Sequence, residues 1–152
     1  MTALKAKTRA AVLQIAEWQL GVVEMPTNSN KVKYNTAYYG REVSGGAYAW
    51  CMAFIWWVFR EAGFSLYKTA SCTTFVNRYK TFAPGQIVTG GYKPGDIVFF
   101  DFSRKRKKTE HVGIVVAYRY CHCQQHSCYS YGKSDSKGKD RKSTRLNSSH
   151  RT

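Results

Sequence analysis

The sequence has few prolines, no long hydrophobic run and no regular cysteine pattern. Three prolines and twelve glycines in 152 residues exclude a collagen-like or proline-rich chain. No stretch approaches the roughly 18 consecutive apolar residues of a membrane span, so we expect no integral membrane protein. The five cysteines are an odd number without the spacing of a disulfide framework, which predicts an unpaired thiol. With 43% hydrophobic and 15% aromatic residues, the chain has enough apolar side chains for one folded domain.

Acidic residues are also scarce, and the net charge of +15 is unevenly distributed. Residues 1–102 contain 11 Lys and Arg against 6 Asp and Glu, whereas residues 103–152 contain 13 against 3. Most of the excess therefore lies where the hydrophobic periodicity has ended, and we expect no nucleic-acid partner. The basic run Arg104–Lys108 is interpreted as a solvated hairpin loop between two strands. A mildly basic folded part suits an anionic polymer such as a bacterial cell wall.

The N-terminal part of the chain predicts a helix followed by a loop. Residues 3–20 carry apolar side chains at helical spacing, which predicts an amphipathic surface helix that ends at Gly21. Gln14 and Glu17 interrupt the apolar stretch and no small-residue cleavage site follows, so we expect no signal peptide and synthesis in the cytoplasm. Residues 25–46 are rich in Asn, Gly and Tyr and are predicted to form a long loop.

Two further helices are predicted before the first strand. Cys51–Ala62 is strongly apolar and is closed by Gly63. Residues 69–81 predict a shorter helix, for which either Thr69 or Ser71 is the cap.

The second half of the chain predicts strands. A short strand is expected over Gln86–Thr89, followed by two longer ones over Asp96–Phe102 and His111–Tyr118, both rich in β-branched and aromatic residues. The hairpin Ser103–Glu110 joins the two longer strands. Because helices precede strands and consecutive strands are joined by a hairpin, the fold class is α+β with an antiparallel sheet.

From Tyr120 onward the composition changes. Residues 120–152 contain one Leu and no Val, Ile, Phe or Met, so this segment cannot bury a core of its own. Asp140–His150 reads like the translation of a sequencing-library adapter and is excluded from fold reasoning. We therefore predict a catalytic domain over residues 1–119 and a disordered or aberrant polar tail over residues 120–152.

Two residues of the folded part can perform chemistry together. Cys51 is the first residue of a predicted helix, where the helix dipole and the first backbone N–H groups favour a thiolate. The same N–H groups can hold the oxyanion of a tetrahedral intermediate. His111 opens a predicted strand, from which an imidazole can reach a helix N-terminus packed on the sheet. This is the papain-type arrangement for acyl transfer.

Each of these residues also has an ordinary structural interpretation. A cysteine before an apolar helix is often a small buried hydrophobic residue, and a histidine at a strand start is often a surface or core residue. A further alternative is a zinc site in the tail, whose ligands would be Cys121, His122, Cys123, His126 and Cys128. The familiar zinc sites place two or more residues between paired ligands and a longer loop between the pairs, and the spacing of this segment does not fit that arrangement, so we expect no metal.

The sequence around Cys51 and His111 resembles the CHAP family of cysteine, histidine-dependent amidohydrolases/peptidases. The matching segments are SNKVKYNTAYYGREVSGGAYAWCMAFIWWVFREAG, YKPGDIVFFDF and EHVGIVV, and the resemblance covers about residues 8–118. It implies a papain-like fold with N-terminal helices packed on an antiparallel sheet. It also implies hydrolysis of an amide bond in bacterial peptidoglycan, as in phage endolysins and bacterial autolysins, by a monomer without a cofactor.

The resemblance assigns roles to individual residues. Cys51 is implied to be the nucleophile and His111 the general base, later the general acid. The third member in the family is usually Glu, Asp or Asn, about 15–20 residues after the histidine, and the segment Gln124–Tyr131 contains none of these. Gln124 and Gln125 are therefore the candidates for orienting the imidazole.

The resemblance also bears on the residues before Cys51. Tyr48 and Trp50 are candidates for a second oxyanion donor or for lining the substrate groove. Some relatives bind calcium through clustered Asp residues before the cysteine, but residues 25–50 contain no Asp and one Glu, so we expect no such site. The absent third residue leaves an alternative function, a catalytically impaired cell-wall-binding or structural module.

Overall fold

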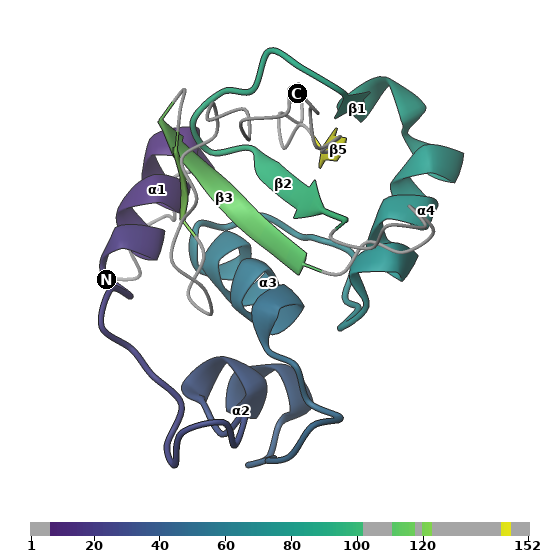
Figure 1. The fold of residues 1–152 in the computed structure, drawn as a ribbon. Coiled ribbons are helices and arrows are strands. Elements are labelled where there is room, and N and C mark those ends of the chain that lie inside the picture. Colours follow the sequence, from purple (N-terminus) through teal and green to yellow (C-terminus); the bar gives the residue numbers. More distant parts are fainter. Residues whose placement is uncertain (1–6, 102–110, 118–119, 123–143, 147–152) are drawn as a thin grey trace, which may run out of the picture. The chain divides into compact units, whose positions relative to one another are not determined.

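The computed structural model describes residues 7–101, 111–117, 120–122 and 144–146 (Figure 1). The chain divides into two compact units, residues 1–70 and 71–152. In the described residues the first unit contains three α-helices, and the second contains one α-helix, a 3₁₀ helix and an antiparallel sheet. The predicted α+β class is therefore confirmed. In the described part of the chain, no helix has the length and apolar character needed to cross a membrane.

The first helix, α1 (Arg9–Glu17), begins at a side-chain cap. Thr8 Oγ1 accepts a hydrogen bond from the backbone N–H of Ala11 at 3.1 Å, which satisfies one of the unpaired donors of the first turn. The predicted helix over 3–20 is too long at its C-terminal end. After Glu17 the backbone continues in single turns, and it then changes direction at Gly21, whose φ is +84°.

The second helix, α2 (Lys33–Tyr39), lies within the segment predicted to be a loop, so that prediction is wrong here. Tyr34 is fully buried, and its ring contacts three aromatic rings of the next helix and its cap. These rings belong to Trp50, Phe54 and Trp57. Burial of an aromatic ring outweighs the weak helix propensity of Tyr and Asn. The helix ends at Gly40, which adopts the left-handed conformation with a φ of +71°.

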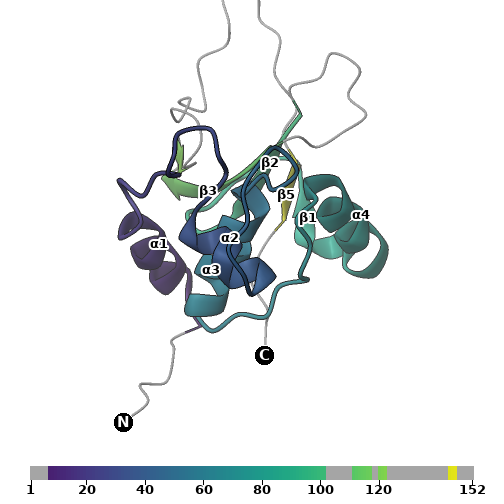
Figure 2. The ribbon, with the colours of Figure 1, turned by 90° about the horizontal axis from the view of Figure 1, so that it is seen from below.

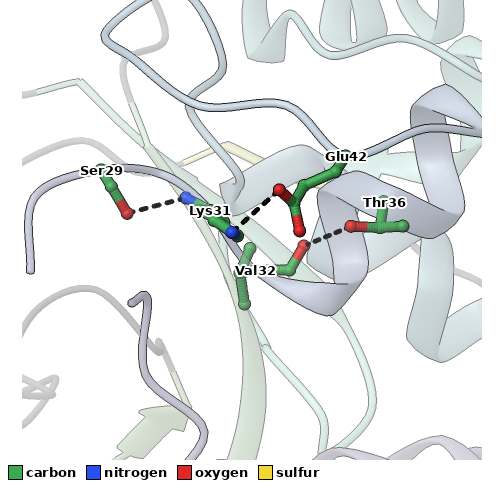
Figure 3. Close-up of polar contacts among 5 residues, drawn as sticks. All are labelled: Ser29, Lys31, Val32, Thr36 and Glu42. Carbon is green, nitrogen blue, oxygen red and sulfur yellow. Dashed lines mark hydrogen bonds and ion pairs between the residues drawn. The ribbon is translucent and has the colours of Figure 1, made fainter. Parts of the chain in front are cut away.

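Polar contacts around the start of α2 are shown in Figure 3. The backbone N–H of Lys31 donates to Ser29 Oγ at 3.1 Å, and Lys31 Nζ lies 2.8 Å from Glu42 Oε1. Thr36 Oγ1 donates to the carbonyl of Val32 at 3.4 Å. Exposed ion pairs contribute at most about 1 kcal/mol, so the apolar contacts of this helix matter more for its stability.

The third helix, α3 (Cys51–Glu61), confirms the prediction, including its end at Gly63. The N–H of Phe64 donates to the carbonyl of Phe59 at 2.8 Å and the N–H of Gly63 to that of Arg60 at 3.0 Å. This is a Schellman motif, completed by the contact of the Phe59 and Phe64 rings at 5.7 Å. Both α1 and α2 pack against α3 (Figure 1), which is therefore the central helix of the first unit.

The second unit begins with α4 (Cys72–Phe82), followed by the 3₁₀ helix η1 (Pro84–Gln86). Of the two predicted caps, Ser71 is the one used, because its Oγ accepts from the N–H of Thr74 at 3.1 Å. The Phe75 ring stacks on Phe99 of the sheet with centroids 5.6 Å apart. This contact packs α4 against the sheet at β2. In Figure 2, α4 lies beside β1.

The sheet has the strand order β1-β5-β2-β3-β4 in the described residues, and every neighbouring pair is antiparallel. The strands are β1 (Ile87–Val88), β2 (Ile97–Phe100), β3 (His111–Ala117), β4 (Tyr120–His122) and β5 (Thr144–Leu146). The predicted pairing of β2 with β3 is confirmed, with Phe100 opposite His111. The predicted hairpin loop between them lies outside the described residues.

Two of these strands belong to the segment predicted to be a polar tail. The backbone of β4 pairs with β3, and that of β5 lies between β1 and β2. The remaining residues of 120–152 lie outside the described ranges. The proposed boundary after residue 119 and the adapter origin of 140–150 stay predictions.

Candidate active site

Cys51 occupies the first position of α3 and is buried, with 9% of its surface exposed. The residue before it, Trp50, provides no side-chain cap, although its carbonyl accepts from the N–H of Phe54 at 2.8 Å. A helix N-terminus without a side-chain cap can direct its first N–H groups to a ligand. Cys51 carries a thiol rather than a disulfide. The arrangement can therefore stabilise both a thiolate and an oxyanion.

The loop in front of Cys51 is held by a buried amide. Asn35 is completely buried, and its Nδ2 donates to the carbonyl of Asn30 at 2.8 Å and to that of Tyr48 at 2.7 Å. Asn30 Nδ2 in turn donates to the carbonyl of Gly45 at 3.1 Å. Two separate loops are thus tied together next to the nucleophile candidate. The sequence analysis missed Asn35 because its segment was predicted to be a loop.

The two aromatic candidates near Cys51 differ in exposure. Tyr48 is half-buried and meets Tyr39 edge to face, with ring centroids 5.2 Å apart. Trp50 is 2% exposed and stacks on Tyr34 at 5.6 Å. Among the described residues Trp50 Nε1 has no hydrogen-bond partner, which costs free energy in a buried position. Tyr48 can therefore reach a substrate, whereas the Trp50 side chain supports the loop from within.

His111 is the first residue of β3 and is half-buried. Its ring stacks on that of Phe100 across the β2–β3 pair, with centroids 6.3 Å apart and planes 27° apart. Such a contact restricts the orientation of the imidazole. Cys51 belongs to the first unit and His111 to the second, and each is placed by its own unit.

A buried carboxylate fixes the start of β2, and the sequence analysis gave it no role. Asp96 is completely buried, and its Oδ2 accepts from the N–H of Lys93 at 2.6 Å. The carbonyl of Asp96 accepts from the N–H of Val115 at 2.9 Å, and the N–H of Gly95 donates to the carbonyl of Val115 at 2.7 Å. The Lys-Pro-Gly-Asp turn thus sets the register of β2 and β3. The Pro-Gly-Asp sequence is the signal that could have predicted this.

Gln124 and Gln125 lie outside the described residues. In the ranges that the structure describes, no three His, Cys, Asp or Glu side chains gather to hold a metal ion.

Comparison with known protein families adds one finding. The family model of the CHAP domain matches residues 43–125, which is more than half of the chain and includes both Cys51 and His111. No curated protein and no solved structure matches the chain.

Proposed function

The chain belongs to the CHAP domain family, and on that premise we propose that it hydrolyses an amide bond of bacterial peptidoglycan with Cys51 as the nucleophile. CHAP domains are in general cysteine-dependent amidases and peptidases of the peptidoglycan-hydrolase type. The observation that carries the proposal is the family match over residues 43–125, which contains a cysteine at a helix start and a histidine at a strand start.

The first half of the proposed reaction forms a thioester. His111 takes the proton from the thiol of Cys51, and the sulfur attacks the carbonyl carbon of the scissile amide. The negative charge that develops on the carbonyl oxygen is stabilised by backbone N–H groups of the first turn of α3. The carbon–nitrogen bond then breaks, and His111 gives its proton to the leaving amine.

The second half of the proposed reaction releases the acid product. His111 accepts a proton from a water molecule, whose oxygen attacks the thioester carbonyl. The carbon–sulfur bond breaks, the proton returns from His111 to the Cys51 thiolate, and a carboxylic acid is released. No metal or cofactor takes part in this scheme.

The scheme also requires a residue that orients the imidazole of His111. The ring of Phe100 stacks on the imidazole, but a stacked ring does not select the tautomer. We propose Gln124 or Gln125 for that role, as a weaker substitute for the Glu, Asp or Asn of relatives. A papain-like packing of the two units is part of the same proposal.

The biological setting proposed for this activity is cell-wall lysis. The chain would be made in the cytoplasm as a monomer and reach the wall during phage lysis or as an autolysin. The mildly basic composition of residues 1–102, with 11 Lys and Arg against 6 Asp and Glu, suits an anionic wall polymer.

A second candidate function is a wall-binding or structural module of impaired activity. The observation that favours it is the absence of Glu, Asp and Asn from Gln124–Tyr131. Loss of the orienting residue of a triad can lower kcat by about 10⁴-fold.

The test incubates the full chain with purified, protein-free cell walls and measures newly released amino groups and soluble fragments. We expect release, and mass spectrometry of the fragments separates the two possible bonds. An amidase leaves glycan chains without peptide, whereas an endopeptidase leaves shortened or separated stem peptides. If the unaltered chain sediments with walls but releases no amino groups, the second candidate is correct and the first is wrong.

A further inference from the structure

Four half-buried aromatic rings form a continuous surface on the first unit, from the loop before α3 across α2 to α3. They belong to Tyr48, Tyr39, Tyr38 and Trp56, and we call them the aromatic row. Consecutive rings meet edge to face, with centroids 5.2, 4.8 and 5.4 Å apart. Rings that served only the core would be buried as completely as Tyr34, which is 0% exposed. The aromatic row instead keeps ring surface in contact with solvent.

Exposed cations stand at both ends of the aromatic row. At one end, Arg41 Nη2 donates to Tyr48 Oη at 3.5 Å. At the other end, Lys68 Nζ lies 4.8 Å from the ring centroid of Tyr38 and 4.9 Å from that of Trp56. The hydrogen bond of Arg41 and the cation–π contacts of Lys68 hold the charged groups close to the rings, and both residues are exposed.

The charges of Arg41 and Lys68 are not neutralised by this unit. Arg60, which also lies over the row, is paired with Glu61 at 3.0 Å. Over the described ranges, neither Arg41 nor Lys68 has an acidic partner. Two uncompensated positive charges next to exposed rings attract a ligand that combines carboxylates with apolar C–H surface.

Two tyrosines of the row, Tyr38 and Tyr39, have raised pKa values. Burial raises the pKa of Tyr38, with smaller contributions from Tyr39 and Tyr67. Burial also raises the pKa of Tyr39, with a contribution from Tyr48. Raised pKa values favour the neutral phenols of Tyr38 and Tyr39, which then do not offset the charges of Arg41 and Lys68.

We propose that the aromatic row, with Arg41 and Lys68, binds the carboxylate-bearing peptide–sugar chain of the substrate and leads it to Cys51. This inference rests on the proposed function. Tyr48 stands three residues before Cys51, and the buried Asn35 holds the Tyr48 carbonyl at 2.7 Å. The end of the row is thus rigidly connected to the nucleophile. Stem peptides carry free carboxylates and the sugars carry apolar faces, which fit ammonium or guanidinium groups and aromatic rings respectively.

The test measures binding separately from hydrolysis. The full chain carrying Cys51→Ala is titrated with a soluble disaccharide–peptide fragment of purified walls, and with the same fragment after amidation of its carboxylates. We expect Arg41→Gln together with Lys68→Gln to weaken binding of the free-carboxylate fragment by about tenfold, the loss of two charge-assisted contacts of modest strength. The Cys51→Ala chain should bind the amidated fragment more weakly than the free-carboxylate fragment, to a similar extent. The affinity of the Arg41→Gln, Lys68→Gln double variant should differ little between the two fragments.

A matched control comes from α4. Arg78 lies over the ring of Phe82, with its Cζ 4.7 Å from the centroid, so Arg78→Gln removes a cation–aromatic pair of the same kind that contains no residue of the aromatic row. This variant should bind the fragment as the parent does. If the double variant and Arg78→Gln have equal dissociation constants, the proposal is overturned.

A second measurement uses the active chain. Tyr39→Ala should raise KM for soluble fragments severalfold with little change in kcat, because the ring binds substrate and does not touch the reacting atoms. Arg41→Gln should do the same without removing any buried ring surface, which keeps the test informative if Tyr39→Ala does not fold. A change in kcat with constant KM would contradict a binding role.

Failure of this inference can be told from failure of the proposed function. One outcome is that the active chain releases fragments, but Arg41→Gln with Lys68→Gln changes neither KM in the active chain nor the dissociation constant in the Cys51→Ala chain. The proposed function then holds and the proposed role of the aromatic row is wrong. If the double variant loses affinity but the parent releases nothing, the row binds and hydrolysis is wrong. Binding of the parent to phosphatidylglycerol vesicles but not to the fragment would overturn the row as a substrate site.

Discussion

Helices α3 and α4 both begin with a cysteine, and their first turns differ in a way that supports the proposal of Cys51, not Cys72, as the nucleophile. Each helix has eleven residues, and both thiols are buried, with 9% of Cys51 and 6% of Cys72 exposed. The difference lies one residue earlier. Ser71 caps α4 with its own hydroxyl, whereas the N-cap residue of α3, Trp50, makes no side-chain cap hydrogen bond. A capping side chain satisfies a backbone N–H group of the first turn and stabilises the helix. Where the N-cap side chain makes no such bond, the first N–H groups can bind a ligand.

The largest effect expected from this comparison is on hydrolysis. Cys51→Ala should lower the rate of amide cleavage by about 10⁴-fold or more, since it removes the atom that attacks the substrate. Cys72→Ala should keep most of the activity, although removal of a buried sulfur can lower stability by about 1 kcal/mol. Release of amino groups from purified walls gives the rates, and thermal unfolding shows that both variants fold. An active Cys51→Ala protein would contradict the assignment of the nucleophile to the start of α3.

The second largest effect concerns His111, the general base that the proposed function pairs with Cys51 and not with Cys72. His111→Ala should lower hydrolysis by about 10³-fold, because nucleophile and base act as a unit. Phe100→Leu is the matched control, since it removes the ring stacked on His111 and leaves the imidazole in place. We expect it to cost less than about tenfold. If the His111→Ala protein retains a third or more of the parent rate, another residue is the base.

The smallest effect is on stability and concerns the capped helix. Ser71→Ala should lower the free energy of unfolding by about 1 kcal/mol, which corresponds to a decrease in Tm of about 3 °C for a chain of this size. Thr8→Ala at the start of α1 should cost a similar amount, since Thr8 makes the same kind of hydrogen bond. Neither substitution should change hydrolysis at a temperature well below Tm. A loss of activity with unchanged Tm in Ser71→Ala would mean that the start of α4 is functional.

Local signals in the sequence were enough to predict α3, α4 and the β2–β3 pair. The glycine at 63 and the serine at 71 act within one or two turns of their own helices, so their effects can be predicted from neighbouring residues. The β-branched and aromatic residues that predict the two strands also act locally. The end of α1 was placed too late because the turns after Glu17 continue the helical spacing up to Gly21.

The features that could not be predicted depend on contacts far apart in the sequence. Helix α2 exists because Tyr34 is buried among rings of α3 and its cap, and its own residues are poor helix formers. Asn35 supports the loop before Cys51 only when that helix has formed. The support of the candidate site was thus not predictable, and the catalytic roles of Cys51 and His111 stay predictions. The third catalytic residue stays a prediction.

The most direct test of the account compares the reactivity of the two thiols. The chain is treated with a limiting amount of iodoacetamide at neutral pH, and the modification of Cys51 and Cys72 is followed by peptide mass spectrometry together with the residual hydrolysis. The account predicts that Cys51 is alkylated at least about tenfold faster than Cys72, and that activity falls in proportion to the modification of Cys51. Equal rates at the two cysteines, or full activity after complete modification of Cys51, would contradict it.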